Sequence, residues 1–580
     1  GGRRESKLAA DDRYTVIADA TLYYRDALAR QLRHAGCEAP DASAPAARWI
    51  LAALQAWGEM GMHRLEGDFA WIAWDATESR LLAARDHAGT RPLFFASVGH
   101  GLAVSSLART LRRVAGVPRE LNLLTIAEDA ADVGTVHASE TPFAGIARLP
   151  AGCALRWSTT RAVNVSRWWE VPIFDRRTAT PFDEASDELL ELIGAAVRTR
   201  FDVEGTAVLL SGGYDSTSVY GAGQMMLQRE GLTPLLKAVS VSHPEGDPGR
   251  EDELILATTQ FWHREPTWVA IDEIPAIDDP QVRAIQRDEP FVHTYELWNR
   301  ALAVACRRDS ARVVFNGLGG DFWFSLSPVF FADHLRQLRW RTLRREWRAL
   351  FGRMTAYDLF KNAIRPNMPP WIVSVGRRVT GMTLGDLAHR SIPPWIRPEF
   401  AKHSGMIERR YARIPRRRTE SFAGAEQAWF LQSPFIERVS AQIDGFYAEA
   451  GLEVRSPLMD ARVIRYAAGR PREESLASSG ENKRLLRRAL RGLLPDSVTG
   501  PRTSRTGLPV SYFHRTVCAH LQQARADFDR GMCLADLGVV DSPRLLSAID
   551  RYLGGAKTDP SDVVAMSYAA HAEWWLRSDP

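Results

Sequence analysis

The fold is decided by the stretch Leu209-Leu210-Ser211-Gly212-Gly213-Tyr214-Asp215-Ser216-Thr217, which joins an apolar run at 206–210 to a helix-forming run at 215–230. Two glycines let a backbone turn tightly and approach an anion closely. The start of a helix offers unpaired N–H groups and the positive end of its dipole to phosphate. The spacing matches neither GxxxxGK[ST] nor GxGxxG. We therefore predict a strand–loop–helix phosphate site; the alternative is a tight turn with a serine cap.

Strands and helices alternate in the segment that follows this loop. The predicted strands cover 206–210, 235–242, 267–271 and 312–315, and the predicted helices cover 215–230, 251–262 and 295–307. Such alternation is typical of an α/β fold with a parallel sheet. Sheets of this kind bind ligands outside the carboxyl ends of their strands.

A second glycine-rich loop, Asn316-Gly317-Leu318-Gly319-Gly320-Asp321, directly follows the predicted strand at 312–315. Asp215 and Asp321 would then share one edge of the sheet and can hold Mg²⁺, which prefers oxygen ligands together with phosphate oxygens. The residues expected to bind the nucleotide phosphates are Ser211, Gly212, Gly213, Asp215, Ser216, Gly319 and Gly320. The alternative for the second loop is a glycine turn with a capping aspartate.

The first 170 residues have a different pattern. Short β-like runs occur at 15–18, 69–74, 81–85, 92–96 and 102–105. Glycine and charged clusters separate them, which predicts an α+β, sandwich-like domain over 1–170. A connector at 167–180 then leads to the α/β domain over 180–580, with a helical insertion at about 325–430.

Composition limits the possible classes of protein. A chain of 580 residues exceeds one core, and a net charge of +4 argues against long nucleic acid as a partner. The five cysteines, at 37, 153, 306, 518 and 533, form no C-x-x-C pair, which suits a reducing compartment. No apolar run approaches the ~18 residues needed to span a bilayer, and residues 1–7 show no signal peptide. We expect a cytoplasmic enzyme without membrane insertion.

These motifs together resemble the class B asparagine synthetase superfamily. Residues 211–216 resemble its pyrophosphate loop, and 317–321 its metal-binding loop. Leu452-Glu453-Val454-Arg455-Ser456-Pro457-Leu458-Met459-Asp460 is similar to its E-x-R-x-P-x-x-D segment, and 483–487 with 494–495 resemble its next helix and stop. The segments that look like its glutamine-hydrolysing domain are 19–23, 65–70, 84–93 and 148–152.

The resemblance implies ATP and Mg²⁺, activation of a carboxylate as an acyl-adenylate, and attack by an amine with release of AMP and pyrophosphate. Glu453 is the candidate base by resemblance; alternatively it pairs with Arg455 and only shapes its loop. Arg505 stands where the family often has a lysine, and arginine stabilises charge without readily donating a proton. Lys483 is a second cation, which either binds pyrophosphate or is a solvated surface residue.

Positions at which this sequence departs from the family pattern indicate which branch of the superfamily it resembles. A glutaminase of this family needs an N-terminal cysteine, whereas this sequence starts with Gly1 and first has a cysteine at Cys37. We therefore expect a degenerate glutaminase-like domain and an amine other than glutamine-derived ammonia. Leu318 stands where β-lactam synthetases have a tyrosine, while Pro393-Pro394-Trp395-Ile396, 148–150 and the helical insertion look more like lasso peptide macrolactam synthetases.

That branch implies a linear core peptide as substrate, closed between an Asp or Glu side chain and the N-terminal amine. It also implies a leader peptidase and a leader-binding protein as partners. The alternatives are an asparagine synthetase-like or β-lactam synthetase-like ligase of small molecules, and a non-catalytic scaffold. Leu318, Phe322 and Arg505 favour the scaffold, but retention of Asp215, Asp321 and Glu453 opposes it. An RNA-thiolating enzyme would need cysteines near the loop, and none is close in sequence.

Two charged segments remain open to two interpretations. The arginine-rich run at 336–353 has an apolar spacing that predicts a helix packed on its own protein, although it could dock an acidic peptide or partner. Glu251-Asp252-Glu253 opens a predicted helix and either matches the helix dipole or forms an acidic pair near the nucleotide.

Overall fold

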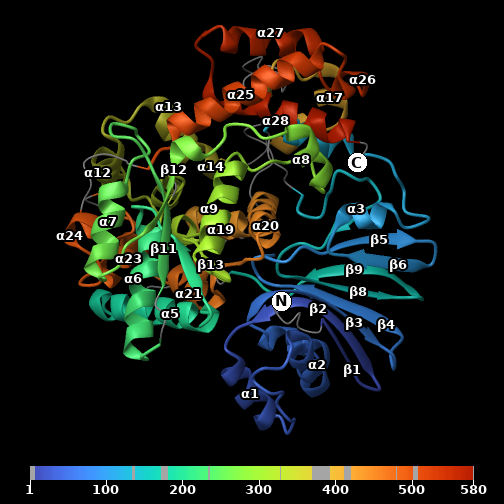
Figure 1. Ribbon diagram of the computed structural model, residues 1–580, viewed down its shortest axis with the longest axis vertical. Helices are drawn as coiled ribbons and strands as arrows, with labels where there is room; N and C mark the ends of the chain where they lie inside the picture. Colours follow the sequence, from blue (N-terminus) through green and yellow to red (C-terminus); the bar gives the residue numbers. More distant parts are fainter. Residues whose placement is uncertain are drawn as a thin grey trace.

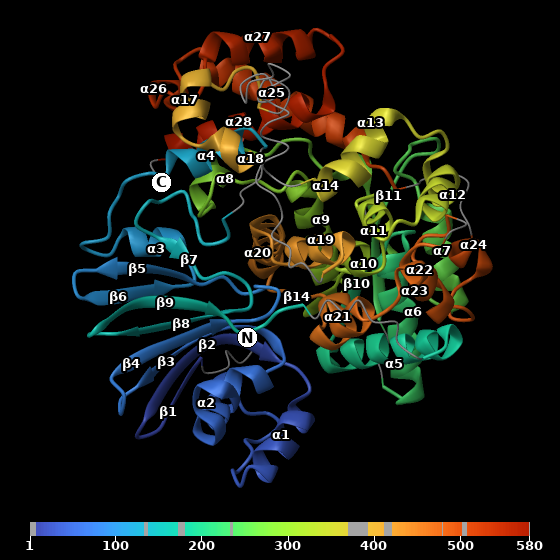
Figure 2. The ribbon, with the colours of Figure 1, turned by 180° about the vertical axis from the view of Figure 1, so that it is seen from behind.

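The computed structural model describes residues 7–132, 137–171, 180–232, 236–326, 328–368, 392–410, 420–477, 480–500 and 507–578. Figure 1 shows the N-terminal antiparallel sheets (blue) beside a parallel sheet surrounded by helices, with the C-terminal helices (red) above both. The opposite side is seen in Figure 2.

The N-terminal part contains two antiparallel sheets. One has the strand order β1-β2-β3-β4-β8-β9, formed by Leu8–Ala10, Tyr14–Leu22, Gly67–Asp75, Arg80–Arg85, Cys153–Ser158 and Arg161–Arg167. The other has the order β6-β5-β7, formed by Gly101–Ser105, Phe94–Val98 and Ala147–Arg148. Helices α1 (Arg25–His34), α2 (Ala46–Trp57), α3 (Ala108–Arg112) and α4 (Leu123–Ala130) flank them.

Alternation along β3 explains how these layers stack. Phe69 and Trp71 point to the core shared with α1 and α2, whereas Ala70 and Ile72 point to a core shared with the second sheet. Phe94 of β5 belongs to a further core with α3 and α4. The result is a helix–sheet–sheet–helix sandwich, which confirms the α+β sandwich predicted from the sequence. All five predicted runs lie in or overlap strands β2 to β6.

The second sheet system is parallel throughout, with the order β12-β11-β10-β13-β14. Its strands are Thr267–Ala270, Lys237–Ser242, Thr206–Leu209, Val313–Phe315 and Glu453–Arg455. This confirms the predicted α/β sheet. Strand β14 was not predicted, because it is only three residues long and pairs with a strand about 140 positions earlier, Val313 opposite Glu453.

Both faces of the parallel sheet are buried. Ala207, Val239 and Val314 pack with α9 (Glu296–Arg308) and α20 (Pro434–Glu449). Val208, Ala238 and Phe315 pack on the other face with α5 (Phe182–Arg200) and α6 (Tyr214–Arg229). Burial on both sides explains why these strands read as short apolar runs in the sequence.

The other helices of the described part lie around the parallel sheet or in the C-terminal part of the chain. They are α7 (Asp252–Phe261), α8 (Pro280–Gln286), α10 (Gly320–Trp323), α11 (Phe330–Arg336), α12 (Trp340–Phe351), α13 (Ala356–Leu359), α14 (Arg365–Asn367), α17 (Pro398–His403), α18 (Met406–Arg410), α19 (Phe422–Leu431), α21 (Ala461–Ala468), α22 (Arg472–Ser475), α23 (Arg484–Ala489), α24 (Asp496–Thr499), α25 (Val510–Phe528), α26 (Cys533–Asp536), α27 (Ser542–Leu553) and α28 (Pro560–Arg577). The short helical turns in the described part of the chain are η1 (Gly58–Arg64), η2 (Ile271–Glu273), η3 (Phe360–Ile364) and η4 (Pro457–Met459). The domain limits at 170 and 180, and those of the helical insertion, stay predictions.

The arginine-rich run predicted as a helix contains α12. Leu343 and Trp347 are buried, and the Trp347 ring lies 4.6 Å from that of Phe331. The packing interpretation is therefore confirmed for this face, although Trp340 and Phe351 at the ends of α12 are half exposed. Within the described ranges, no helix is both long and apolar enough to cross a membrane.

Buried charge pairs join the N-terminal sandwich to the parallel-sheet part. Arg85 donates a 2.8 Å hydrogen bond to Glu437 of α20, and both side chains are 1% exposed. The same carboxylate accepts from the Ala151 amide at 2.9 Å. Arg462 donates twice to Glu66 at 2.8 Å. These contacts hold the two parts in a fixed arrangement.

Replacing Arg85 by methionine is expected to lower the thermal unfolding temperature strongly. Removal of one partner from a buried pair leaves the other charge uncompensated, at a cost of about 3–5 kcal/mol. Differential scanning fluorimetry measures the shift. The matched control is Arg30→Met at an exposed position of α1, which should change the midpoint little. Equal midpoints for the two variants would show that the Arg85–Glu437 pair does not stabilise the structure.

Candidate active site

Hydrogen bonds between Ser211 and Ser216 join the two ends of the predicted phosphate loop. It begins where β10 ends at Leu209 and runs to Tyr214, the first residue of α6. The Ser211 amide donates to the Ser216 hydroxyl at 3.0 Å, and the two hydroxyls lie 2.9 Å apart. No side chain caps the start of α6. The strand–loop–helix prediction is confirmed, and the alternative of a serine-capped turn is not what the structure has.

Glu251 contacts this loop directly. Its Oε2 accepts a 2.9 Å hydrogen bond from the Gly212 amide, and Glu251 is 9% exposed at the start of α7. Its neighbour Asp252 accepts from the Ser242 hydroxyl at 2.5 Å. The structure therefore favours the interpretation in which the acidic run lies beside the loop.

The second loop approaches the first through glycines. A Cβ on Gly320 would lie 2.0 Å from Asp215 Cγ, and one on Gly317 would lie 2.7 Å from the Ser216 amide nitrogen. Gly319 has a φ of +107°, which side chains rarely adopt. These glycines allow the loop after β13 to lie directly against the loop after β10.

Lys483 joins the two predicted metal ligands. Its Nζ lies 2.5 Å from Asp215 Oδ1 and 2.7 Å from Asp321 Oδ1. The lysine side chain is 8% exposed, so the interpretation of a solvated surface residue is wrong. Burial raises the pKa of Asp215 to about 6 against the opposing effect of Lys483. Lys483 is the residue before α23 and has a φ of +52°.

This arrangement suits a cation bound together with phosphate. Two carboxylates converge on one positive charge, and the described residues contain no group of three or more His, Cys, Asp or Glu side chains that could hold a metal. A magnesium ion usually takes one or two carboxylates and completes its shell with water and substrate phosphates. Asp215 and Asp321 fit that requirement.

Glu453 is held by three hydrogen-bond donors. It accepts hydrogen bonds from Thr21 at 2.5 Å, Arg91 at 2.8 Å and Arg455 at 2.8 Å. Burial raises its pKa, but Arg455, Arg91 and Thr21 outweigh that effect and hold the pKa at about 2. A carboxylate so stabilised accepts a proton poorly at neutral pH. The structure shows the pairing with Arg455 that the alternative interpretation expects, and the assignment of Glu453 as base stays a prediction.

A different acid lies in a small pocket beside the second loop. The pocket has a volume of about 20 Å³ and is lined by Asp68, Ala88, Thr90, Asn316, Leu318, Ser440, Ile443, Asp444, Val454, Ser456 and Met459. Asp444 of α20 has a buried oxygen without a hydrogen-bond partner in the described structure. Burial raises its pKa to about 8, although Arg91, whose Nη1 lies 3.7 Å from Asp444, opposes the shift. The sequence offered no signal for Asp444.

Three further residues that the sequence analysis singled out are Arg505, Phe322 and Trp395. Arg505 lies outside the described residues. Phe322 packs on Phe430 with ring centres 4.8 Å apart. Trp395, in the segment compared with the lasso branch, is 1% exposed in the core formed with the C-terminal helices. It therefore contributes to packing and does not line the site.

Gly320→Ala is expected to lower the thermal midpoint and to separate the two loops, because its methyl group would overlap the Asp215 carboxylate. Overpacking of this kind costs about 1–3 kcal/mol. Scanning calorimetry measures the change. The control is Gly445→Ala in α20, where nothing lies within 4 Å of an added Cβ. An unchanged midpoint for Gly320→Ala would show that the loops tolerate wider spacing.

The chain is similar to several characterised sequences. It is 24% identical over 505 residues to asparagine synthetase [glutamine-hydrolyzing] 3 of Bacillus subtilis, which covers 84% of this chain and 74% of that protein. It is 30% identical over 218 residues to a putative asparagine synthetase of Mycobacterium bovis, which covers 36% and 33%. A match at 24% identity to amidase chry2 of Gibberella zeae covers 55% and 50%.

One solved structure, a glutamine phosphoribosylpyrophosphate amidotransferase from B. subtilis, aligns with a TM-score of 0.20 at 12% identity, covering 53% of this chain and 62% of its own. A score this low supports no inference. The family comparison is decisive: a glutamine amidotransferase domain model matches residues 7–169, and the asparagine synthase model matches residues 188–577. The chain therefore belongs to the asparagine synthase family and is an ATP-dependent, AMP-forming carbon–nitrogen ligase.

Proposed function

We propose that this ligase adenylates a side-chain carboxylate of a linear peptide and closes a macrolactam with the N-terminal amine of the same peptide. The observation that carries the adenylation step is the convergence of Asp215 and Asp321 on Lys483. This group lies where the chain order of the strands reverses, between β10 and β13. Ligands of open parallel sheets bind at such switch points.

The phosphate loop would bind the part of ATP that leaves. The start of α6 offers N–H groups and a positive dipole end to phosphate oxygens. Lys483 would stabilise negative charge as the carboxylate attacks the α-phosphorus and pyrophosphate departs. A magnesium ion held by Asp215 and Asp321 would neutralise the phosphates and align them.

The second step needs a neutral amine beside the acyl-adenylate. Asp444 and Asp68 place two carboxyl groups in the small pocket, and none of its described lining residues is basic. Such a pocket attracts an ammonium group, and a carboxylate of raised pKa can then accept its proton. An α-amine has a pKa of about 8, which matches that of Asp444. We therefore assign the role of base to Asp444.

The N-terminal sandwich is proposed to support the ligase part. Thr21 and Arg91 of this sandwich hold Glu453 on β14, and Tyr24 donates to Asp460 at 2.9 Å. Val454 of strand β14 and Ser456, the residue after the strand, in turn form a wall of the pocket. Peptide specificity rests on the resemblance of 148–150, 393–396 and the helical insertion to the lasso branch. A leader peptidase and leader-binding protein would supply the free amine.

The first test uses mass spectrometry of the purified protein with ATP, Mg²⁺ and linear leaderless peptides. We expect the peptide to lose about 18 Da, one water, with formation of AMP, and the Asp215→Asn, Asp321→Asn double variant to be inactive because the phosphates lose their cation ligands. The peptide precursor encoded nearest to the ligase gene is the first candidate.

Formation of AMP with a small amino acid and an amine, but with no peptide, would contradict the macrolactam assignment and favour a small-molecule amide ligase. Absence of AMP with every acceptor would favour a scaffold. The double variant retains the loops and their glycines, so its fold can be verified by thermal melting.

Asp444→Asn should slow the amine-attack step by about 10²–10⁴-fold, the usual contribution of a general base. In the unchanged enzyme, Asp444 accepts a proton only when ionised, so the rate should rise with pH and level off above about 8. The variant should lose this pH dependence while still forming the acyl-adenylate, measured as pyrophosphate exchange. Glu453→Gln is the comparison: retention of the pH profile in that variant separates the two acids.

A further inference from the structure

A second pocket on the molecule is lined mainly by arginines. It has a volume of about 300 Å³ and lies where α3 and the loop after it meet the residues following α8 and the end of α28. Its lining residues are Arg109, Arg112, Arg113, Arg119, Phe143, Ile285, Arg287 and Ser578. None of these described lining residues is Asp or Glu, and none belongs to the loops at β10 and β13.

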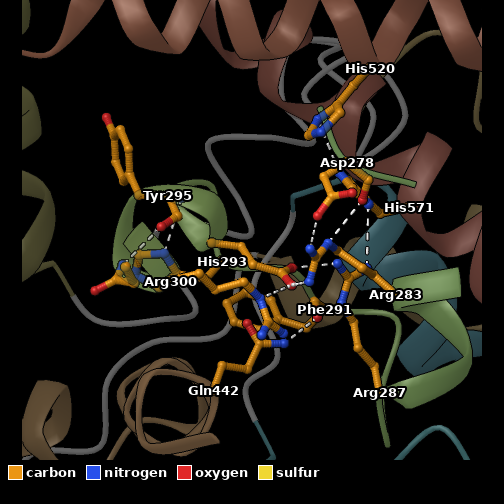
Figure 3. A network of polar contacts seen from close by, with 12 residues as sticks. Asp278, Arg283, Arg287, Phe291, His293, Tyr295, Arg300, Gln442, His520 and His571 are labelled. Atoms are coloured by element: carbon orange, nitrogen blue, oxygen red, sulfur yellow. Dashed lines mark hydrogen bonds and ion pairs between the residues drawn. The ribbon is translucent and has the colours of Figure 1, made fainter. Parts of the chain in front are cut away.

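Two of these arginines are paired with acids outside the pocket. Arg109 lies 3.3 Å from Asp288. Arg287 lies 2.5 Å from Glu296, and its Nη1 is 3.4 Å from His571 Nδ1, as Figure 3 shows for the Arg287–His571 pair. Burial lowers the pKa of Arg287 although Glu296 opposes the change.

The other three arginines are uncompensated. Arg112, Arg113 and Arg119 form no ion pair with any residue in the described ranges. Arg112 Nε is buried without a hydrogen-bond partner there, and its guanidinium lies 5.3 Å from the centre of the Phe143 ring. Like charges gathered in one depression repel one another, and this repulsion is relieved when an anion binds between them.

The size and the lining of the pocket indicate which class of anion fits it. Arginines line the pocket from α3, from the loop after α3 and from position 287, so three segments of the chain contribute positive charge to it. The volume is at the lower end of the range for small-molecule sites, about 300–1,000 Å³. One guanidinium group can donate two parallel hydrogen bonds to the oxygens of a phosphate, and each phosphate can bind more than one arginine.

We propose that this pocket binds a small polyphosphate anion through Arg112, Arg113 and Arg119, at a site separate from the ATP site. The ligand is either a free inorganic polyphosphate or the phosphate tail of a nucleotide, since both present the same groups. The proposal goes beyond the proposed ligase activity and does not depend on it.

Isothermal titration of the full chain with inorganic triphosphate tests the site, at about 0.15 M salt where exposed charges are screened. A chelator removes divalent ions and so weakens binding at Asp215 and Asp321. The double variant R113Q/R119Q should bind about tenfold more weakly or worse, because it loses two charge-assisted contacts. Both side chains are exposed, so the fold should persist, which thermal melting verifies.

The matched control is R344Q/R345Q, which removes two exposed arginines from α12. It should bind triphosphate as the unchanged protein does. An equal loss in both double variants would mean that triphosphate binds by net charge alone and would overturn the proposal, as would unchanged binding in R113Q/R119Q.

Two further titrations identify the source of the anion. A second binding event with ATP that R113Q/R119Q abolishes would assign the pocket to the tail of a nucleotide. Binding of triphosphate alone would assign it to the free anion. A hexaglutamate peptide that binds more tightly than triphosphate, and is lost in R113Q/R119Q, would show that the pocket takes acidic peptides and would overturn the polyphosphate assignment.

Discussion

The close contact between two strand-end loops is the constraint on which the site depends. Asp215 and Asp321 carry like charges, and they come together because Gly317 and Gly320 leave no side chain between the loops and because Lys483 lies between the carboxylates. Lys483 arrives from a segment far along the chain and adopts a left-handed backbone conformation that costs energy for a residue with a side chain. The surrounding fold must hold it there. The parallel sheet and the helices on both of its faces thus serve to place one ammonium group between two acids.

The N-terminal sandwich contributes to the same site from a distance. Strand β14 is three residues long and could not hold its register alone. Glu453 at its start is fixed by Thr21 and Arg91 from the sandwich, and the Arg85–Glu437 pair fixes α20 behind it. Helix α20 carries Asp444. A part of the chain that matches a glutamine amidotransferase domain therefore shapes the ligase pocket through buried charge pairs.

The sequence allowed the phosphate loops to be predicted because their signal is local. Glycine spacing after an apolar run specifies a turn, and the turn specifies where Asp215 and Asp321 lie. Lys483 remained ambiguous, since a lone lysine before a helix looks the same whether it is buried or solvated. Strand β14, the Arg85–Glu437 pair and Asp444 depend on contacts between residues 140 to 353 positions apart, such as Arg85 with Glu437, and no local pattern records them. The resemblance placed Glu453 at the right segment, but its role depends on Thr21 and Arg91, which come from the other part of the chain.

Three carboxyl groups in this part of the molecule have different pKa values because their neighbours differ. Glu453 contacts two arginines and has a pKa of about 2. Asp215 faces one lysine and has a pKa of about 6. Asp444 is buried with a single arginine at 3.7 Å, and its pKa is about 8. An acid whose pKa is raised on folding costs stability progressively as the pH rises from its unfolded value, about 3.9, through its folded one. The fold thus bears a cost at Asp444 at neutral pH, whereas the lowered pKa of Glu453 contributes stability at any pH above its unfolded value. A group that is costly to keep in the folded state, beside the two strand-end loops, is typical of a residue retained for chemistry, while one that stabilises the interface is typical of a residue retained for structure.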